Sequence, residues 1–210
     1  MVKILLPPPQ NIPNPLLRHL PAGTTLYRIF APGHLGINAL TFRSFGPKVR
    51  FDHHRGLWQD GKRRAAEDAE RRIYYAAFSL SGCLVECFGD TELIQVWGQY
   101  LAKPVTTREL VLLDLQGSGA MRAGANAALA KVADRVISQA WASYFYEHPG
   151  VYTPVDGMIY TNAHNEEAAL ALFERAENSL QCSSQQVWPL ADWRSDIMQA
   201  AAANNLKLPP

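Results

Sequence analysis

The stretch IYYAAFSLSGCLVECF, residues 73–88, combines a strand and a helix with almost nothing between them. IYYAAF is a short apolar run of the kind that forms a buried strand. Ser79 then stands where a helix N-cap is expected, so we predict a helix that continues through Phe88. Five residues share one face of this helix: Leu80, Cys83, Leu84, Cys87 and Phe88. We interpret the two cysteines on that apolar face as core residues rather than ligands.

Three more segments are predicted to be strands. ELVLLDL (109–115) is a continuous apolar run bounded by charge and glycine, and it is the clearest buried strand in the chain. LYRIF (26–30) forms an early strand and GMIYT (157–161) a short late one. The sequence therefore indicates a domain in which strands and helices are mixed.

Two further helices are predicted from apolar residues at helical spacing. The first carries Leu129, Val132, Val136, Ala140 and Tyr144, and this spacing places the region of Trp141 and Tyr144 in the core. The second begins near Asn165, a suitable N-cap that is followed by Glu166 and Glu167. Its buried stripe consists of Leu172, Phe173, Ala176 and Leu180.

Length and composition favour one domain. At 210 residues with 48% hydrophobic content, the chain can bury a sizeable core, and we expect a single domain over residues 24–210. Residues 1–23 are rich in proline and should run extended over the surface as an arm. Residues 60–72 are densely charged, which predicts a solvated loop or a short exposed helix.

The charges of the chain nearly cancel. Lysine and arginine number 20 against 19 acidic residues, so a net charge of +1 provides no global field to attract nucleic acid or an anionic membrane. The N-terminal apolar stretch is too short for a signal peptide, and no later stretch approaches the roughly 20 apolar residues of a spanning helix. Three cysteines without a framework spacing suit a reducing compartment, so we expect a soluble, cytoplasmic protein.

Three charged residues are candidates for chemistry. Glu86 points away from the apolar face of its helix, and Gly82, one turn earlier, leaves room for a ligand beside the carboxylate. Taken alone, such a glutamate is more often a surface acid. Arg28 and Arg50 stand in apolar, strand-like runs, where each needs either a structural ion pair or an anionic ligand such as phosphate.

Taken together and in order, these residues resemble the RES-domain family, which is named for its arginine, glutamate and serine. The resemblance rests on Arg28 in LYRIF, Arg50 in RFD, the spacing from Tyr75 to Glu86, and the late DGMIYTN. It spans residues 26–176. The family implies an α+β fold like that of ADP-ribosyltransferases, with mixed, largely antiparallel central sheets and surrounding helices.

The resemblance also implies a function. RES-domain proteins cleave the nicotinamide–ribose bond of NAD, with water, phosphate or a protein as acceptor, and many are toxins whose antitoxin carries a helix-turn-helix domain. NAD would be the substrate, and no cofactor is implied. Arg28 and Arg50 would hold its phosphates and ribose, Tyr75 would orient the nicotinamide, and Glu86 would promote cleavage. Tyr160, Thr161 and Asn162 would complete the binding site.

One position departs from the family pattern. Asn162 stands where the family has serine, two residues after Tyr160, and Thr161 carries a hydroxyl one residue earlier. An asparagine can donate to phosphate or ribose, but it is not a nucleophile. An alternative function is therefore a degenerate member that binds a nucleotide or a partner without chemistry.

Two other motifs have simpler explanations. His53 and His54 are interpreted as exposed loop residues, and His164 lacks a second histidine at zinc-site spacing, so no metal is predicted. QGSGAMRAG (116–124) follows a strand in the order of a dinucleotide loop. Arg122 stands where that fingerprint needs glycine or alanine, which favours a simple turn into a helix.

Overall fold

The computed structural model describes residues 4–33 and 36–208, so the first three residues of the expected arm lie outside the described part. The strands are β1 (Leu17–Leu20), β2 (Arg28–Phe30), β3 (Phe45–Gly46), β4 (Leu57–Gln59), β5 (Lys62–Arg64), β6 (Ala66–Glu67), β7 (Ile73–Ala77), β8 (Tyr100–Ala102), β9 (Val105–Thr106), β10 (Leu110–Asp114), β11 (Gly157–Thr161), β12 (Ala168–Phe173), β13 (Leu180–Gln181) and β14 (Val187–Pro189). The α-helices are α1 (Leu80–Phe88), α2 (Ser118–Arg122), α3 (Arg135–Glu147), α4 (Pro149–Tyr152) and α5 (Arg194–Ala203). The 3₁₀-helices are η1 (Ala127–Lys131), η2 (Glu174–Ser179), η3 (Ser184–Gln186) and η4 (Leu190–Trp193).

The central sheet has the strand order β1-β10-β11-β12-β7. Only β10 and β11 run parallel, while the other three neighbouring pairs are antiparallel. A second sheet, in the order β14-β8-β2, is antiparallel throughout. The predicted α+β class with mixed, largely antiparallel sheets is therefore confirmed.

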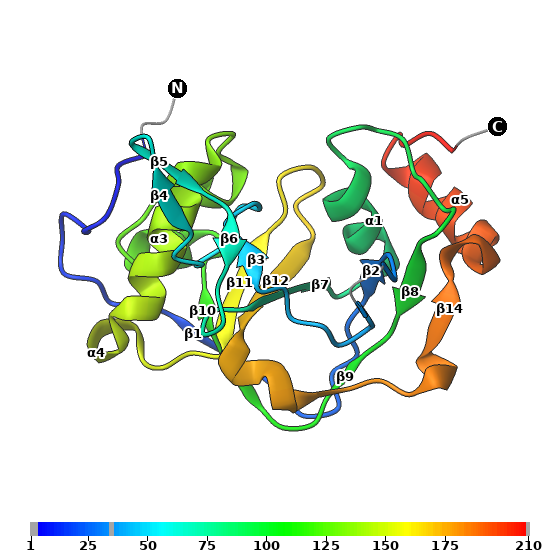
Figure 1. The fold of residues 1–210 in the computed structure, drawn as a ribbon, viewed down its shortest axis with the longest axis horizontal. Helices are drawn as coiled ribbons and strands as arrows, with labels where there is room; N and C mark the ends of the chain where they lie inside the picture. The colour runs from blue at the N-terminus through cyan, green and yellow to red at the C-terminus, as the bar shows by residue number, and fades with distance from the viewer. Residues whose placement is uncertain (1–3, 34–35, 209–210) are drawn as a thin grey trace.

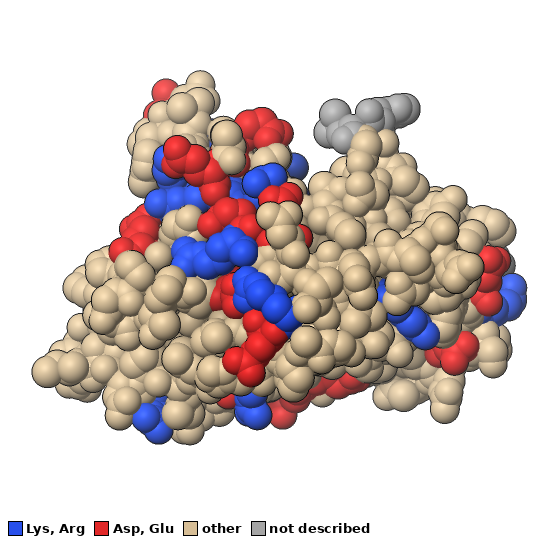
Figure 2. Space-filling model, turned by 90° about the horizontal axis from the view of Figure 1, so that it is seen from below, with Lys and Arg blue, Asp and Glu red and all other residues tan. Residues whose placement is uncertain are grey.

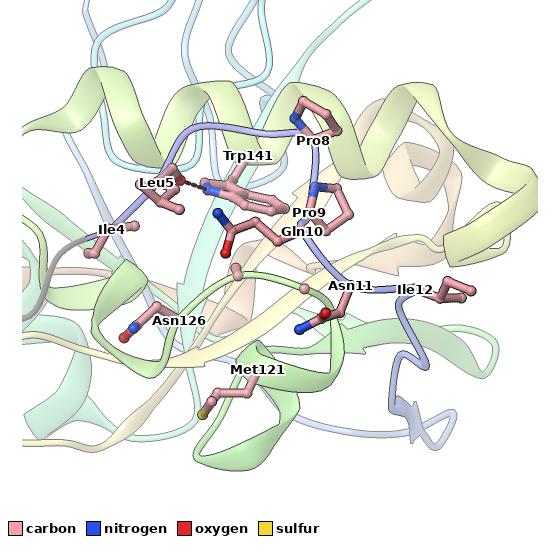
Figure 3. A pocket seen from close by; sticks show the side chains of 12 residues that line it. Ile4, Leu5, Pro8, Pro9, Gln10, Asn11, Ile12, Met121, Asn126 and Trp141 are labelled. Atoms are coloured by element: carbon pink, nitrogen blue, oxygen red, sulfur yellow. Dashed lines mark hydrogen bonds between the residues drawn. The ribbon is translucent and has the colours of Figure 1, made fainter.

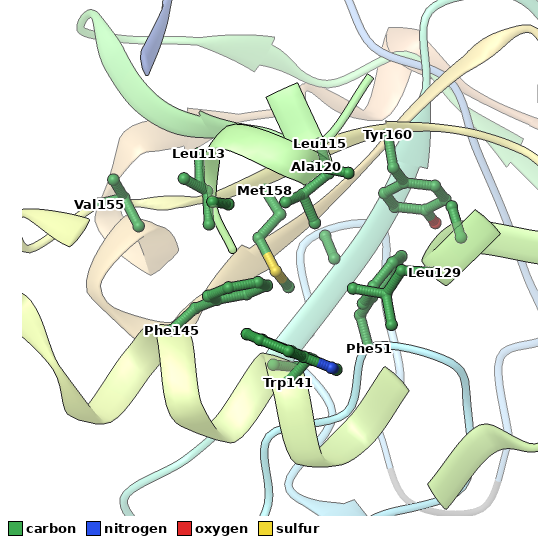
Figure 4. Close-up of a cluster of buried hydrophobic side chains, with 14 of the residues drawn as sticks. Phe51, Leu113, Leu115, Ala120, Leu129, Trp141, Phe145, Val155, Met158 and Tyr160 are labelled. Carbon is green, nitrogen blue, oxygen red and sulfur yellow. The ribbon is translucent and has the colours of Figure 1, made fainter. Parts of the chain in front are cut away.

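The two faces of the central sheet bury different cores, because neighbouring residues of a strand face opposite sides. One face packs against α3, and Figure 4 shows Trp141 and Phe145 of that helix beneath Met158 and Tyr160 of the sheet. The other face buries Tyr74 and the alternate leucines of β10 and β12. The prediction that Trp141 is a core residue is confirmed, since it is only 1% exposed.

Helix α1 lies on the other half of the molecule, beside α5 and the second sheet (Figure 1). It begins where the sequence predicted, because the Ser79 side chain accepts a hydrogen bond from the Gly82 amide at 2.9 Å. An isolated bridge between Tyr27 and Ala77 connects β2 to the end of β7. Helix α1 therefore starts where the two sheets meet.

The prediction of a helix after Asn165 is wrong. Residues 168–173 instead form β12, the strand between β11 and β7 in the central sheet. Its sequence AALALF is apolar on both faces, as a strand buried on both sides must be, whereas an amphipathic helix needs a polar face. The helical spacing of Leu172, Phe173, Ala176 and Leu180 arises because a strand is followed by the 3₁₀-helix η2.

Two other segments differ from the predicted helices and loops. The charged segment 60–72 contains strands, and β4 and β5 form a hairpin whose turn residues Asp60 and Gly61 have φ of 51° and 70°. Asp-Gly favours such a two-residue turn. The helix predicted from residue 129 begins only at Arg135, because Asp134 caps its N-terminus through the Val136 amide.

The proline-rich arm contributes to the fold. Residues 16–20 contain no proline, so their amides are free to pair, and β1 becomes an edge strand of the central sheet beside β10. Part of the segment expected to be an arm is therefore paired with the domain expected from residue 24. Residues 4–16 form neither helix nor strand, and the Trp141 indole donates a 2.8 Å hydrogen bond to the Leu5 carbonyl (Figure 3). A cavity of about 240 Å³ lies between this segment, the loop 124–126 after α2, and Trp141 of α3.

Charged side chains of both signs lie next to each other on the face shown in Figure 2. The structure contains many such pairs, including Arg108 with Asp156 at 2.6 Å and Arg72 with Glu177 at 2.7 Å. Within the described ranges, no helix has the length and apolar character needed to cross a membrane.

Candidate active site

A small cavity lies where α1, β2, β7 and β11 meet. Its volume is about 70 Å³. Three of the expected site residues, Tyr75, Glu86 and Tyr160, share its wall. The other lining residues are Ile29, Ala76, Ala77, Cys83 and Cys87. Cys87 is exposed, so the expectation that both cysteines are core residues holds only for Cys83.

Glu86 lies at the mouth of this cavity. Its side chain is exposed, yet the protein atoms crowded around it remove part of its hydration. This desolvation raises the pKa of the carboxyl group, while the positive charge of Arg50 opposes the rise and the negative charge of Asp90 adds to it. The result is a carboxylate in a partly dry position, where the charge of Arg50 acts on it more strongly than it would in water.

Access to Glu86 does not come from the side expected from the sequence. Gly82 is buried, and a Cβ atom there would lie 3.1 Å from the Glu167 carboxylate and 3.2 Å from the Ser79 hydroxyl. The space beside Gly82 is therefore filled by the residues that hold the N-terminus of α1. The cavity lies on another side of Glu86, where Tyr75 and Tyr160 line it.

Arg50 stands in a turn rather than in a strand. Its guanidinium donates a hydrogen bond to the Val132 carbonyl, and the Gln139 side chain of α3 donates to the neighbouring Val49 carbonyl at 3.0 Å. These contacts fix the turn against the start of α3. They bring the Arg50 charge close enough to influence the pKa values of both Glu86 and Tyr160.

Two tyrosines form the aromatic part of the cavity wall. The Tyr75 hydroxyl donates to the Asp52 carboxylate at 2.8 Å and accepts from the Phe51 amide at 3.2 Å. Burial raises the pKa of both Tyr75 and Tyr160, and the nearby carboxylates Asp52 and Glu86, respectively, raise them further. Both phenols therefore stay protonated and present neutral aromatic surfaces to the cavity.

The order of these residues along the chain and their gathering around one cavity agree with a family model. The model of the RES domain matches residues 25–193. This chain belongs to the RES-domain family.

One solved structure supports the fold of this RES domain. A chain in the crystal structure of the M. tuberculosis MbcT–MbcA toxin–antitoxin complex is 16% identical and aligns with a TM-score of 0.50, covering 84% of this RES domain protein and 90% of that chain. At this identity the likeness shows the fold alone. Among curated proteins, none matches the sequence.

Arg28 of the RES domain does not reach the cavity. Its guanidinium lies 4.0 Å above the ring of Tyr74 and donates to the Thr41 carbonyl at 2.9 Å. Tyr74 and Tyr75 are neighbours in β7 and face opposite sides of the sheet. The Nε and Nη1 atoms of Arg28 are buried and have no hydrogen-bond partner among the described residues. The structure therefore separates the two arginines that the sequence grouped together.

Asn162 of the RES domain is also outside the cavity. Its side chain is fully buried, and its oxygen accepts from the amides of His164 and Asn165 at 3.0 and 2.9 Å. Its amide group donates to the Asn165 side chain at 2.6 Å. These contacts fold the turn between β11 and β12, while Thr161 follows Tyr160 in the strand and faces the opposite side. Neither Asn162 nor Thr161 lines the cavity, so this geometry does not support the ligand contacts expected of them.

The two histidines after Arg50 are not exposed, contrary to the expectation. His53 and His54 are both fully buried. His53 lies 3.1 Å from the Glu174 carboxylate, and His54 lies 2.9 Å from the Arg43 carbonyl. Burial lowers the pKa of each ring, so both are neutral supports of the loop near pH 7. The ring of His53 packs on Phe173, the last residue of β12, which accounts for its burial.

The remaining predictions concern the glycine loop and metals. Gly117 precedes the five-residue helix α2, and Gly119 packs against the Asp114 carbonyl, so the loop is the simple turn favoured by the sequence. Over residues 4–33 and 36–208, no three side chains of His, Cys, Asp or Glu gather closely enough to hold a metal ion.

Sequence reasoning missed Asp52 and Phe51, the residues that connect Arg50 to the cavity. The ring of Phe51 packs against Tyr160, and Asp52 binds Tyr75. Both follow Arg50 directly in the motif RFD, and that position was the available signal.

Proposed function

We propose that this RES-domain protein cleaves the nicotinamide–ribose bond of NAD. The observation that carries the proposal is that the Glu86 carboxylate and the rings of Tyr75 and Tyr160 line one cavity, with the Arg50 charge near enough to act on Glu86 and Tyr160. Breaking a glycosidic bond builds positive charge on the ribose. A fixed carboxylate that is already in place stabilises this charge in the transition state.

Each of the gathered residues has a role in the proposed reaction. Glu86 faces the ribose carbon that loses nicotinamide, and it holds a ribose hydroxyl or aligns the nucleophile. Tyr75 and Tyr160 offer flat, neutral surfaces for the nicotinamide ring. Arg50 presents a planar fork that suits the diphosphate.

The size of the cavity restricts how NAD binds. At about 70 Å³ it is well below the roughly 300–1,000 Å³ of sites that enclose a whole ligand. In the proposed complex only the reacting end of NAD enters. The diphosphate and the adenosine lie outside, across the turn that carries Arg50.

We further propose that the protein acts in the cytoplasm as the toxin of a toxin–antitoxin pair. Membership of the RES family and the fold shared with a chain of the MbcT–MbcA toxin–antitoxin complex support this role. The partner would be a cognate antitoxin with a helix-turn-helix domain. Expression of the wild-type chain should then stop growth and deplete cellular NAD. Co-expression of a helix-turn-helix protein encoded by a neighbouring gene should restore both growth and NAD.

The reaction is tested by incubating the purified protein with NAD and separating the products by chromatography. Free ADP-ribose identifies water as the acceptor, and a phosphorylated ADP-ribose that forms only in phosphate buffer identifies phosphate. ADP-ribose attached to a polypeptide identifies a protein acceptor. Absence of nicotinamide release in plain buffer, in phosphate buffer and with added polypeptide contradicts the proposal.

A second candidate is a protein that binds NAD without cleaving it. The observation in its favour is that Asn162, which replaces the family serine, is buried and engaged in its own turn. Calorimetric titration separates the two functions. Tight binding of NAD without release of nicotinamide favours the binding protein, and lack of binding contradicts both.

A further inference from the structure

Asp52 is fully buried and accepts hydrogen bonds from four different groups. The Arg43 guanidinium contacts its two oxygens at 2.6 and 2.8 Å. The amides of Lys48 and Val49 donate to Oδ2, the latter at 2.9 Å. The Tyr75 hydroxyl donates to Oδ1 at 2.8 Å. One carboxylate therefore connects a loop, an arginine and a residue of the cavity wall.

The contacts to Oδ2 determine the shape of the turn. The Asp52 amide donates back to the Val49 carbonyl at 3.2 Å, so residues 48–52 close on the side chain of Asp52 itself. Arg50 lies inside this closed turn, between Val49, whose amide donates to the carboxylate, and Asp52 itself. Its hydrogen bond to the Val132 carbonyl, and with it the place of its charge near Glu86, depends on that turn.

The contact to Oδ1 fixes the cavity wall. Tyr75 is held from two sides, because its hydroxyl donates to Asp52 and accepts from the Phe51 amide. We infer that Asp52 is a positioning residue, which holds Arg50 and Tyr75 in a fixed relation across the site. This inference rests on the proposed function, since it assigns Asp52 to the NAD-binding geometry rather than to stability alone.

The charge of Asp52 adds to the inference. Burial opposes ionisation, but the Arg43 guanidinium and the two amides outweigh it and hold the pKa of Asp52 below its usual value. The carboxylate is therefore an acceptor only, and the Tyr75 hydroxyl must donate to it. Tyr75 then contacts its substrate through its ring, because its hydroxyl proton is already donated to Asp52.

Asp68 provides a matched control. It is 4% exposed, and it binds the Arg55 guanidinium at 2.6 and 3.1 Å. It also accepts from the backbone amides of Arg55, Glu70 and Arg71. Asp68 is thus a second buried carboxylate that pairs with an arginine and shapes a loop, but its hydrogen bonds go to residues outside the cavity wall.

The test compares Asp52→Asn with Asp68→Asn. Both variants should unfold at lower urea concentration, because each loses a charge-assisted pair. Asp52→Asn should also raise the KM for NAD and lower kcat, with kcat/KM reduced at least tenfold, while Asp68→Asn stays within about twofold of the wild type. Equal kcat/KM for the two variants, measured where both are folded, overturns the inference.

A second measurement does not depend on cleavage of NAD. Protein labelled with 3-fluorotyrosine gives a fluorine resonance for Tyr75 that is identified by its loss in Tyr75→Phe. This resonance should shift in Asp52→Asn and stay in place in Asp68→Asn. An unmoved resonance contradicts the positioning role even if the wild type cleaves NAD. A shifted resonance in a protein that neither binds nor cleaves NAD contradicts the proposed function and leaves the role of Asp52 in holding Tyr75 intact.

Discussion

The ring of Phe51 packs against the ring of Tyr160, with the two centroids 4.7 Å apart. Phe51 belongs to the turn that carries Arg50, whereas Tyr160 belongs to β11 and lines the cavity. This contact joins the turn to the main core, as Figure 4 shows. The position of Arg50 therefore depends on core packing as well as on the hydrogen bonds of its turn.

Replacing Phe51 should affect both stability and binding. Phe51→Ala and Phe145→Ala each remove a buried ring from the same core, so each should lower the free energy of unfolding by about 3–5 kcal/mol. Only Phe51→Ala should also raise the KM for NAD, because Phe51 belongs to the Arg50 turn and packs on Tyr160, whereas Phe145 belongs to α3. Urea unfolding and steady-state kinetics measure the two effects, and equal KM values would contradict the link between Phe51 and the site.

The two expected arginines should behave differently. Arg50→Met should raise the Kd for NAD about tenfold to a hundredfold, since a hydrogen bond to a charged group contributes roughly 1.5–3 kcal/mol. Arg28→Met should leave the Kd within about twofold, because its guanidinium lies over Tyr74 on the other side of β7. Calorimetric titration checks both values. A larger loss at Arg28 would show that NAD crosses to that side.

Glu86 should make stability depend on pH in an unusual direction. Its folded-state pKa is raised, so its contribution to the free energy of unfolding is complete below the ordinary glutamate pKa of 4.5 and is lost as pH rises through the folded value. Glu86→Gln should therefore be more stable than the wild type at pH 7 and no more stable near pH 4. Urea unfolding at the two pH values measures this, and the opposite order contradicts the partial desolvation of Glu86.

The N-terminal segment should contribute measurable stability through Gly124. This glycine has φ of +85°, and a Cβ atom there would lie 2.4 Å from Pro9. Gly98 has a similar φ of +71° with open space around it. Gly98→Ala should cost only the backbone strain of about 1–2 kcal/mol, whereas Gly124→Ala should cost more because the segment is displaced. Equal thermal midpoints would mean that Pro9 does not pack there.

The sequence predicted the part of the fold in which local signals and tertiary packing agree. The Ser79 cap, the helix through Phe88 and the strand at 157–161 follow from residues that favour the same structure locally and in the core. The prediction for the segment after Asn165 was wrong because a strand buried on both faces is apolar throughout, so its residues also satisfy a helical spacing. Only the pairing of this segment with β11 and β7 distinguishes a strand from a helix here.

The site was predicted less completely than the fold. Tyr75, Glu86 and Tyr160 line one cavity and Arg50 lies close by, as the family order implied, but Arg28 and Asn162 lie elsewhere. Which face of a strand a residue occupies changes with a shift of one position, and no pattern in LYRIF fixes that register. The place of Asp52 beside Arg50 marks it as a site candidate, but the sequence does not show that its distant partner is Tyr75.

The role of Glu86 is tested most directly by nicotinamide release from NAD. Glu86→Gln keeps the size of the side chain and removes its charge, and Glu92→Gln makes the same change at an exposed position beyond the end of α1. The account predicts that Glu86→Gln binds NAD within a few-fold of the wild type but releases nicotinamide about a hundredfold more slowly, while Glu92→Gln keeps the wild-type rate. Release by Glu86→Gln at the wild-type rate would contradict the account.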